Sequence, residues 1–241
     1  MTMPQRVTLN RALSKLGFGS RTQAMLWIRQ GKVRVDGKVI TNPLSWVEIG
    51  QKILLQEQGP TRKESLALVM NKPCGLVTTR SDELGRKTVF DLLPKEHGYL
   101  FPAGRLDADS EGLLLFSNDS SLTHALTEPG HEVEKTYWVM VRNALDEPAL
   151  EKLRRGVKLG DKVTRPCKVK FLAEEKGHQV LQFILQEGMN RQIRNMVRAM
   201  GSKVLRLVRT AIGAIQLGEL PVGKTRVLNK QELAALRRAR S

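Results

Sequence analysis

The sequence is poor in cysteine and in aromatic residues. Its 241 residues include two cysteines, three tryptophans, two tyrosines and six phenylalanines. Cys74 and Cys167 lie far apart and neither belongs to a closely spaced pair, which argues against a disulfide framework or a zinc site. The four histidines show no metal-ligand spacing either. We therefore expect a cytoplasmic protein that binds no metal.

Long apolar runs and nucleotide-binding loops are also missing. No apolar stretch approaches the roughly 20 residues that a membrane-spanning helix needs, so we expect no membrane partner. No glycine-rich phosphate-binding loop is present, which disfavours nucleotide hydrolysis. No Ser-His-Asp or Cys-His arrangement stands out by its spacing. We expect any activity to proceed without an organic cofactor.

Acidic residues are scarce relative to basic ones. The 24 aspartates and glutamates oppose 40 lysines and arginines, which leaves a formal net charge of +16. An excess of this size is typical of proteins that bind nucleic acid or another anionic surface. Between Gly188 and Gly218 the sequence contains no acid at all.

The first sixty residues have the pattern of a small module. Apolar residues recur at helical spacing from Leu9 to Leu16, and Ser20 with Gln23 forms the capping box of a second helix. Asp36-Gly37 lies between two short alternating runs, which predicts a β-hairpin. The pattern predicts a helix-helix-hairpin module.

Basic residues cluster around the second helix and the hairpin of this module. An ordinary solvated face is one interpretation, since most charge runs are of that kind, but the clustering favours contact with an RNA backbone. The candidate RNA-binding residues are Arg21, Arg29, Lys32, Arg34 and Lys38. Residues 16–21 (LGFGSR) and 28–39 (IRQGKVRVDGKV) resemble the alpha-L RNA-binding domain, the type found in ribosomal protein S4.

The remaining chain has the pattern of a second domain. We predict an RNA-binding domain over residues 1–60, a polar linker over 61–65 and a second domain over 66–241. In the second domain we expect a strand over residues 134–141, a helix between Asp146 and Gly156, a helix around Ile193, a strand over 214–217 and a helix over 230–238. Strands and helices do not alternate regularly, so the predicted class is α+β.

Residues 104–116 combine a charged loop with an apolar run. The run after Gly112 predicts a buried strand, and the loop before it holds three carboxylates and Arg105. A solvated loop with local capping explains this composition equally well. Asp107 and Asp109 lie two residues apart, too close to flank a glycosidic bond from opposite sides. The pattern leaves one aspartate beside an arginine in a basic surface.

Four further motifs point to one family. Residues 71–79 (NKPCGLVTT), 104–115 (GRLDADSEGLLL), 134–137 (EKTY) and 188–194 (GMNRQIR) resemble, in order, the motifs of the RsuA/RluB/RluF-type RNA pseudouridine synthases. The resemblance covers nearly the whole chain, although Asn195 departs from the second arginine common at that position. It implies a mixed, mainly antiparallel sheet in the second domain.

The resemblance also implies site residues and roles. Asp107 would be the catalytic aspartate, acting either by covalent attack or by removal of a ribose proton, and Arg194 would pair with it and keep it charged. The target uridine would be flipped out of its stack. Arg105 would fill the space that it leaves, while Tyr137 would stack on the base and Ile193 would pack against it.

Two functions therefore compete. The first is a monomeric RNA pseudouridine synthase whose partner is ribosomal RNA or a pre-ribosomal particle, with the large-subunit RNA favoured over the small-subunit RNA by the resemblance of residues 86–91. The second is a non-catalytic RNA-binding protein of ribosome assembly, which the N-terminal module and the charge would equally suit. A lone carboxylate in a basic groove favours the enzyme.

Overall fold

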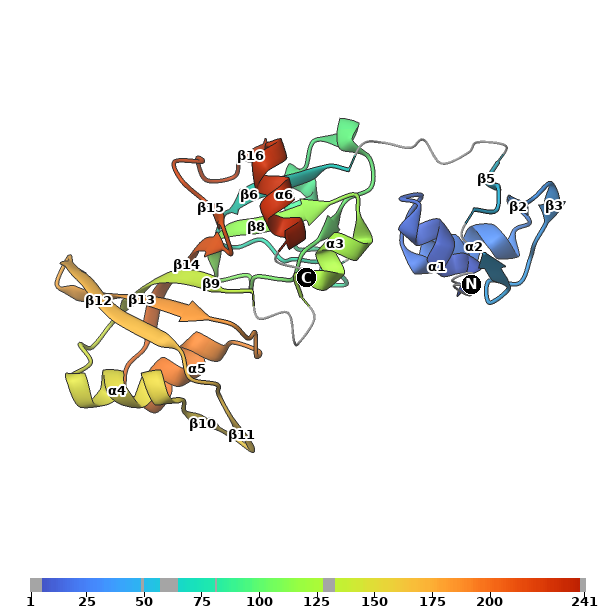
Figure 1. Ribbon diagram of the computed structural model, residues 1–241. Coiled ribbons are helices and arrows are strands. Elements are labelled where there is room, and N and C mark those ends of the chain that lie inside the picture. The colour runs from blue at the N-terminus through green and yellow to red at the C-terminus, as the bar shows by residue number, and fades with distance from the viewer. Residues whose placement is uncertain (1–5, 49, 57–64, 81, 128–132, 239–241) are drawn as a thin grey trace.

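A computed structural model describes residues 6–48, 50–56, 65–80, 82–127 and 133–238 (Figure 1). Residues 61–64 of the predicted linker lie outside the described residues. The N-terminal elements are β1 (Arg6–Thr8), α1 (Leu9–Lys15), α2 (Arg21–Arg29), β2 (Val33–Val35), β3 (Lys38–Val39), β4 (Trp46–Glu48) and β5 (Ile53–Leu55). Strand β1 pairs with β4, and β3, β2 and β5 form a separate sheet.

Local sequence signals account for this N-terminal module. The Ser20 side chain accepts a hydrogen bond from the Gln23 backbone N–H and thereby caps α2 as predicted. Asp36 and Gly37 both have positive φ, 48° and 83°, which the tight β2–β3 turn requires. The apolar faces of α1 and α2 pack on β2, with Leu13 and Ile28 fully buried.

A large mixed sheet dominates the rest of the chain. Its strands are β6 (Ala67–Lys72), β7 (Phe101–Pro102), β8 (Glu111–Ser117), β9 (Lys135–Val141), β12 (Lys168–Glu175), β13 (His178–Leu185), β14 (Val204–Ile212), β15 (Ile215–Gln216) and β16 (Thr225–Val227). The main path runs β12-β13-β9-β14-β8-β6-β16. Among the paired strands of the described residues, only β14 and β8 are parallel. The predicted α+β fold with a mainly antiparallel sheet is therefore confirmed.

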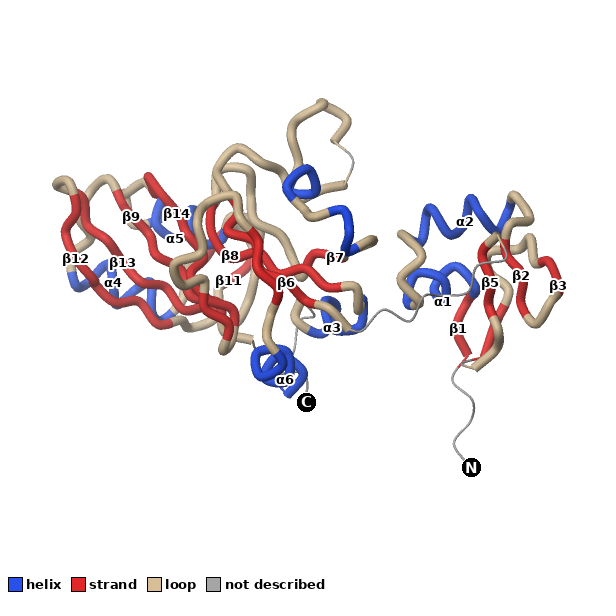
Figure 2. The backbone as a smooth tube through the Cα atoms, turned by 90° about the horizontal axis from the view of Figure 1, so that it is seen from above, coloured by secondary structure: helices blue, strands red, loops and turns tan. Residues whose placement is uncertain are grey.

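Helices and loops cover this sheet in separate blocks. The elements are the 3-10 helices η1 (Val89–Leu92) and η2 (Lys95–His97), the helices α3 (Ser120–Ala125), α4 (Glu147–Arg155), α5 (Gln192–Ala199) and α6 (Lys230–Arg238), and the hairpin β10 (Lys158–Leu159) and β11 (Lys162–Val163). Helices α4 and α5 pack on β9, β13 and β14, whereas α3 and α6 pack near β6 and β8 (Figures 1 and 2).

Strand β8 is buried on both faces. Leu113 and Leu115 point into the core beneath α3 and α6, while Leu114 and Phe116 point into a core formed with η1 and the loop before β7. Burial on both sides explains why this segment is continuously apolar instead of alternating. The loop that precedes β8 is thereby attached to a strand in which every residue after Glu111 is buried.

The predicted elements agree with the structure, but several strands of the second domain were not predicted. Helix α4 begins after Asp146, whose side chain caps it, and ends at Gly156. The predicted strand over 214–217 is shorter than expected, covering Ile215–Gln216. The most consequential omission is β14, because its arginines interrupt the apolar pattern of what the structure shows to be a central strand.

Candidate active site

A cavity of about 580 Å³ lies where two cores of the second domain meet. Tyr137 marks the junction, because it packs against the core under α5 and also against the core beside η1. Four of the predicted site residues line this one cavity: Arg105, Asp107, Tyr137 and Ile193. They come from the loop before β8, from β9 and from the start of α5, segments far apart in the sequence.

The loop that carries Asp107 is fixed from one side by Lys72. This lysine has no exposed surface, and its Nζ donates to the carbonyl oxygens of Pro73, Ala108 and Ser110 at 3.0, 3.4 and 2.7 Å. Burial lowers the pKa of Lys72 to about 8, although nearby carboxylates, including Asp109, oppose the shift. The last residue of β6 thus holds the backbone on both sides of Asp109.

A second set of hydrogen bonds fixes the same loop through residues 75–78. The Gly75 N–H donates to the Ala108 carbonyl at 2.7 Å. The Thr78 hydroxyl donates to the Leu106 carbonyl at 2.9 Å and accepts from the Leu106 N–H at 3.3 Å. Asp107 therefore stands on a loop whose backbone is held at both neighbouring residues.

Arg191 provides the guanidinium nearest to Asp107. Its backbone lies in the left-handed region, with φ of 49°, directly before α5. Its Nη1 lies 3.5 Å from Asp107 Oδ2, and its two terminal nitrogens donate to both Asp109 oxygens at 3.1 and 2.7 Å. These hydrogen bonds lower the pKa of the Asp109 carboxyl, which is therefore ionised at neutral pH.

Arg194 has a different partner from the predicted one. Its Nη2 donates to the Asp109 carbonyl at 2.6 Å, and its Nε lies 3.4 Å from the Asp109 carboxylate. Burial lowers the pKa of Arg194, but an arginine stays protonated. The expected pairing with Asp107 is corrected, because Arg191 precedes α5 and reaches Asp107, whereas Arg194 lies one turn further along the helix.

Besides Arg191 and Arg165, two further basic residues that line the cavity were not among the predicted site residues. Arg209 is 3% exposed and its Nε donates to the Leu113 carbonyl at 2.7 Å. Lys135 donates to the Val133 carbonyl, and burial together with the charge of Arg209 lowers its pKa. Both residues line the cavity. Lys135 lies within the 134–137 motif, whereas Arg209 has no signal in the sequence beyond a basic residue in a run of strand-forming residues.

Gly112 explains how these groups come so close together. Its φ is 98°, and a Cβ at this position would lie 2.3 Å from the Arg209 carbonyl oxygen and 2.8 Å from the Arg209 nitrogen. Only glycine allows the parallel contact between β8 and β14 at this point. The contact places Arg209 beside the cavity.

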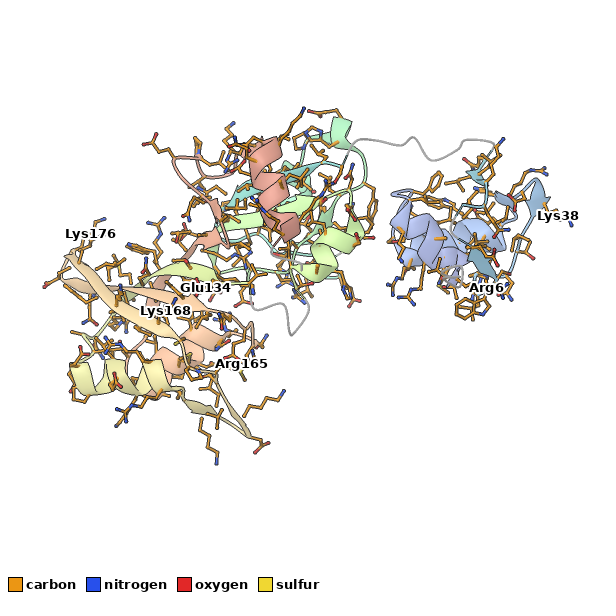
Figure 3. All side chains as sticks on the ribbon, viewed as in Figure 1. Arg6, Lys38, Glu134, Arg165, Lys168 and Lys176 are labelled. Atoms are coloured by element: carbon orange, nitrogen blue, oxygen red, sulfur yellow. The ribbon has the colours of Figure 1, made fainter. Side chains whose placement is uncertain are left out.

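The predicted RNA-binding residues belong to the other unit. Arg21, Arg29, Lys32, Arg34 and Lys38 are all exposed on the N-terminal module. Arg34 donates to the Gly37 carbonyl within its own hairpin, and Lys38 points away from the module (Figure 3). None of the five lines the cavity.

Neither a metal cluster nor a membrane span was found in the part of the chain that the structure describes. No three histidine, cysteine, aspartate or glutamate residues there are grouped so as to hold a metal ion. None of the described helices combines the length and apolar character that crossing a membrane requires.

Comparison with known proteins identifies the family. A family model described as RNA pseudouridylate synthase matches residues 67–199, and an S4 domain model matches residues 7–53. The chain belongs to the RNA pseudouridine synthase family. This membership confirms the predicted family, the N-terminal RNA-binding domain and the enzymatic activity, and it favours the enzyme over the non-catalytic assembly protein.

Relatives that match almost the whole of this chain agree with this membership. The pseudouridine synthase chain is 35% identical over 237 residues to ribosomal large subunit pseudouridine synthase B of Bacillus subtilis, covering 95% of each protein. It is 32% identical to the protein of the same name from Pseudomonas aeruginosa, covering 97% of this chain and 62% of that one. A crystal structure of a pseudouridylate synthase superposes with a TM-score of 0.70 at 27% identity, covering 95% of this chain and 99% of the other.

Proposed function

We propose that this pseudouridine synthase modifies a uridine of large-subunit ribosomal RNA, and that Asp107 is its catalytic carboxylate. The observation that carries the proposal is the position of Asp107, which lines a cavity together with an aromatic, an aliphatic and several basic side chains. The names of the relatives from Bacillus subtilis and Pseudomonas aeruginosa support the large-subunit RNA as the substrate.

The reaction is an isomerisation and needs no external reactant. The bond between uracil N1 and ribose C1′ breaks, the base turns, and a bond forms between C5 and C1′. The proton on C5 is lost and N1 gains one, so atoms and electrons balance. The Asp107 carboxylate begins this sequence either by covalent attack or by removing a ribose proton, and both routes require its ionised form.

The cavity suits a single flipped nucleotide. Its volume of about 580 Å³ lies within the ordinary range of small-molecule sites. In the proposed complex, Tyr137 stacks on the uracil and Ile193, which is 4% exposed, forms an apolar wall. Arg105 is exposed at the rim, where it can occupy the position left by the flipped nucleotide.

The two arginines at the start of α5 have separate roles in this proposal. Arg191 faces Asp107 and stabilises its negative charge directly. Arg194 binds the backbone and carboxylate of Asp109, and thereby fixes the loop on which Asp107 stands. Asp109 is the link between them, because its carboxylate orients Arg191 toward the cavity.

The N-terminal module supplies RNA affinity in this proposal. Its exposed cations contact the phosphate backbone, while the chemistry stays in the second domain. We retain the division into residues 1–60, 61–65 and 66–241 as part of the proposal. The monomeric state, the cytoplasmic location and the absence of a cofactor remain predictions from the sequence.

The test compares two neighbouring aspartates. Asp107→Asn keeps the size and hydrogen-bonding capacity of the side chain but removes its charge, so RNA binding should survive and isomerisation should fall below detection. Asp109→Asn should reduce activity more mildly, because it weakens the hold on Arg191 without removing the reacting group. The measurement is tritium release from ribosomal RNA labelled at uracil C5, alongside RNA binding. Substantial activity in Asp107→Asn would contradict the catalytic assignment.

A second experiment tests the substrate. Pseudouridines should be mapped in both ribosomal RNAs from cells with and without this gene. We expect one position in the large-subunit RNA to lose its modification. A loss confined to the small-subunit RNA would reject the large-subunit RNA as the substrate while leaving the role of Asp107 untouched.

A further inference from the structure

A second hollow adjoins the active-site cavity on the side of the β10–β11 hairpin. Its volume is about 650 Å³, and it lies between the hairpin and the exposed side of α5. Met189 and Asn190 line both the cavity and this hollow, so these two residues form a common border between the two spaces. An RNA chain that crosses this border on leaving the cavity reaches the hollow.

The lining of this hollow is basic. Lys158, Lys162 and Arg198 contribute exposed side chains, and none of the three forms an ion pair with a carboxylate among the described residues. The acid of the hairpin, Asp161, lies in the turn and does not line the hollow. Three unpaired cations in one concave surface favour a ligand with several negative charges.

The hairpin that forms one wall is fixed in place. Thr164 is 2% exposed; its N–H donates to the Val157 carbonyl and its hydroxyl accepts from the Val157 N–H, at 3.0 and 2.9 Å. Gly156 lies so close that a Cβ there would be 2.4 Å from the Thr164 carbonyl oxygen. The lysines of the hairpin therefore project from a base that is already ordered, which reduces the entropy lost on binding.

We propose that the hollow binds the backbone phosphates of the single-stranded RNA that flanks the uridine in the cavity. The inference rests on the proposed function, since it takes the cavity as the nucleotide site. No aromatic ring of the described residues lines the hollow, so bases have no ring there on which to stack, and its cations suit phosphates instead. The border shared with the cavity identifies the strand, because a flipped nucleotide remains bonded to its neighbours.

The test removes two positive charges from the hairpin and compares the effect on RNA binding with that of removing two positive charges elsewhere. The variant is Lys158→Gln/Lys162→Gln in the full chain. Its control is Lys170→Gln/Lys176→Gln, which changes the net charge equally on exposed residues of the β12–β13 region. Lys176 lies at the tip of the β12–β13 hairpin. It is remote from Arg165, which lines the cavity (Figure 3).

Binding of an unmodified transcript of large-subunit ribosomal RNA is measured over a range of salt concentrations. Each lost contact with a single strand should reduce the slope of log affinity against log salt by about 0.7, so the hairpin variant should lose roughly 1.4. The control should keep the wild-type slope. A wild-type slope in the hairpin variant, or an equal loss of slope in both variants, would overturn the proposal.

Two further readouts distinguish binding of a flanking single strand from a role in catalysis or in duplex binding. In the tritium-release assay the hairpin variant should raise KM and leave kcat unchanged, and a fall in kcat alone would overturn the proposal. With a fully double-stranded RNA the two variants should bind equally, and a selective loss by the hairpin variant would assign the hollow to duplex RNA instead.

A wild-type protein that binds the transcript without modifying it would reject the proposed function, while the salt slopes would still test this surface.

Discussion

The N-terminal module and the active-site cavity use the same basic residue types in opposite ways. In the module, the five candidate RNA-binding cations are exposed. Around the cavity, Lys72, Arg194 and Arg209 are buried or half-buried, and each donates to a backbone carbonyl. Burial, not residue type, separates the cations that are free to contact RNA from those that fix the protein.

This difference has an energetic consequence. A buried donor that is removed leaves its carbonyl partners unsatisfied, at a cost of about 1–3 kcal/mol for each group. An exposed cation that is removed usually changes stability by less than about 0.5 kcal/mol. Substitutions in the two regions should therefore affect different measurements, and the following experiments compare them.

The largest effect is expected at Gly112. Gly112→Ala places a Cβ against the Arg209 backbone and should lower the free energy of unfolding of the second domain by more than about 3 kcal/mol. Chemical denaturation of the full chain measures this loss. The control is Gly177→Ala, where φ is 73° but no described atom lies within 4 Å, so only the roughly 1 kcal/mol of backbone strain applies. Equal losses in both variants would show that the close strand contact is unimportant.

A large effect on catalysis is expected at Arg194. Arg194→Ala removes the guanidinium that holds Asp109, and the displaced loop should lower kcat about a hundredfold. Arg194→Lys should recover only part of the activity, because lysine lacks the planar fork of donors. Arg142→Ala, directly after β9, exposed and outside both the cavity and the hollow, should keep the wild-type kcat. Full activity in Arg194→Ala, measured by tritium release, would remove its positioning role.

A moderate effect on binding is expected in the N-terminal module. The variant Arg29→Gln/Lys32→Gln/Lys38→Gln should raise KM about tenfold and flatten the salt dependence of RNA binding, because fewer counterions are released. Its kcat should not change, since no described residue of the module lines the cavity. Replacing Lys170, Lys176 and Lys203 with glutamine provides a control of equal charge. A triple variant of the module with the wild-type salt slope would contradict its role in binding.

The smallest effect is expected from the titration of Lys72. Its pKa is about 8 in the folded protein, against an ordinary value of 10.5. Between these values the unfolded chain holds a proton that the folded chain has lost, so the free energy of unfolding rises with pH. The contribution cannot exceed about 1.4 kcal/mol per pH unit.

The measurement compares wild type with Lys72→Met by chemical denaturation from pH 7 to pH 10. The wild type should gain stability relative to the variant only above about pH 8, the folded-state pKa of Lys72. The exposed Lys170→Met variant should follow the wild type throughout. A constant difference between wild type and Lys72→Met would show that Lys72 titrates normally.

Local patterns predicted much of the fold. Helices α2 and α4 were found because Ser20 and Asp146 cap them, and the β2–β3 hairpin because Asp36-Gly37 suits its turn. Strand β14 was missed because its arginines have no local feature that indicates burial. Arg209 is buried by contacts with residues far away in the sequence, such as its hydrogen bond to Leu113, 96 positions earlier.

Only part of the site was predicted, again because contacts between residues distant in the sequence leave no local signal. The motifs indicated Asp107, Tyr137 and Ile193, which the structure places around one cavity. The predicted partner of Arg194 was wrong, because the sequence shows which arginines and aspartates are available but not which of them form contacts. Lys72 was overlooked, since a fully buried lysine is rare and only the position of the 104–110 loop explains it.

The parallel pairing of β8 with β14 also bears on the order in which the chain acquires its parts during synthesis. The described strand pairs of the N-terminal module join residues within the first 55, whereas β8 pairs with β14 beyond residue 203 and β6 pairs with β16 beyond residue 224. Domains generally fold in the order in which they leave the ribosome. We therefore expect a growing chain to hold an RNA-binding surface long before it holds a cavity. Chains that end before β14 should show a protease-resistant module and no protected second domain.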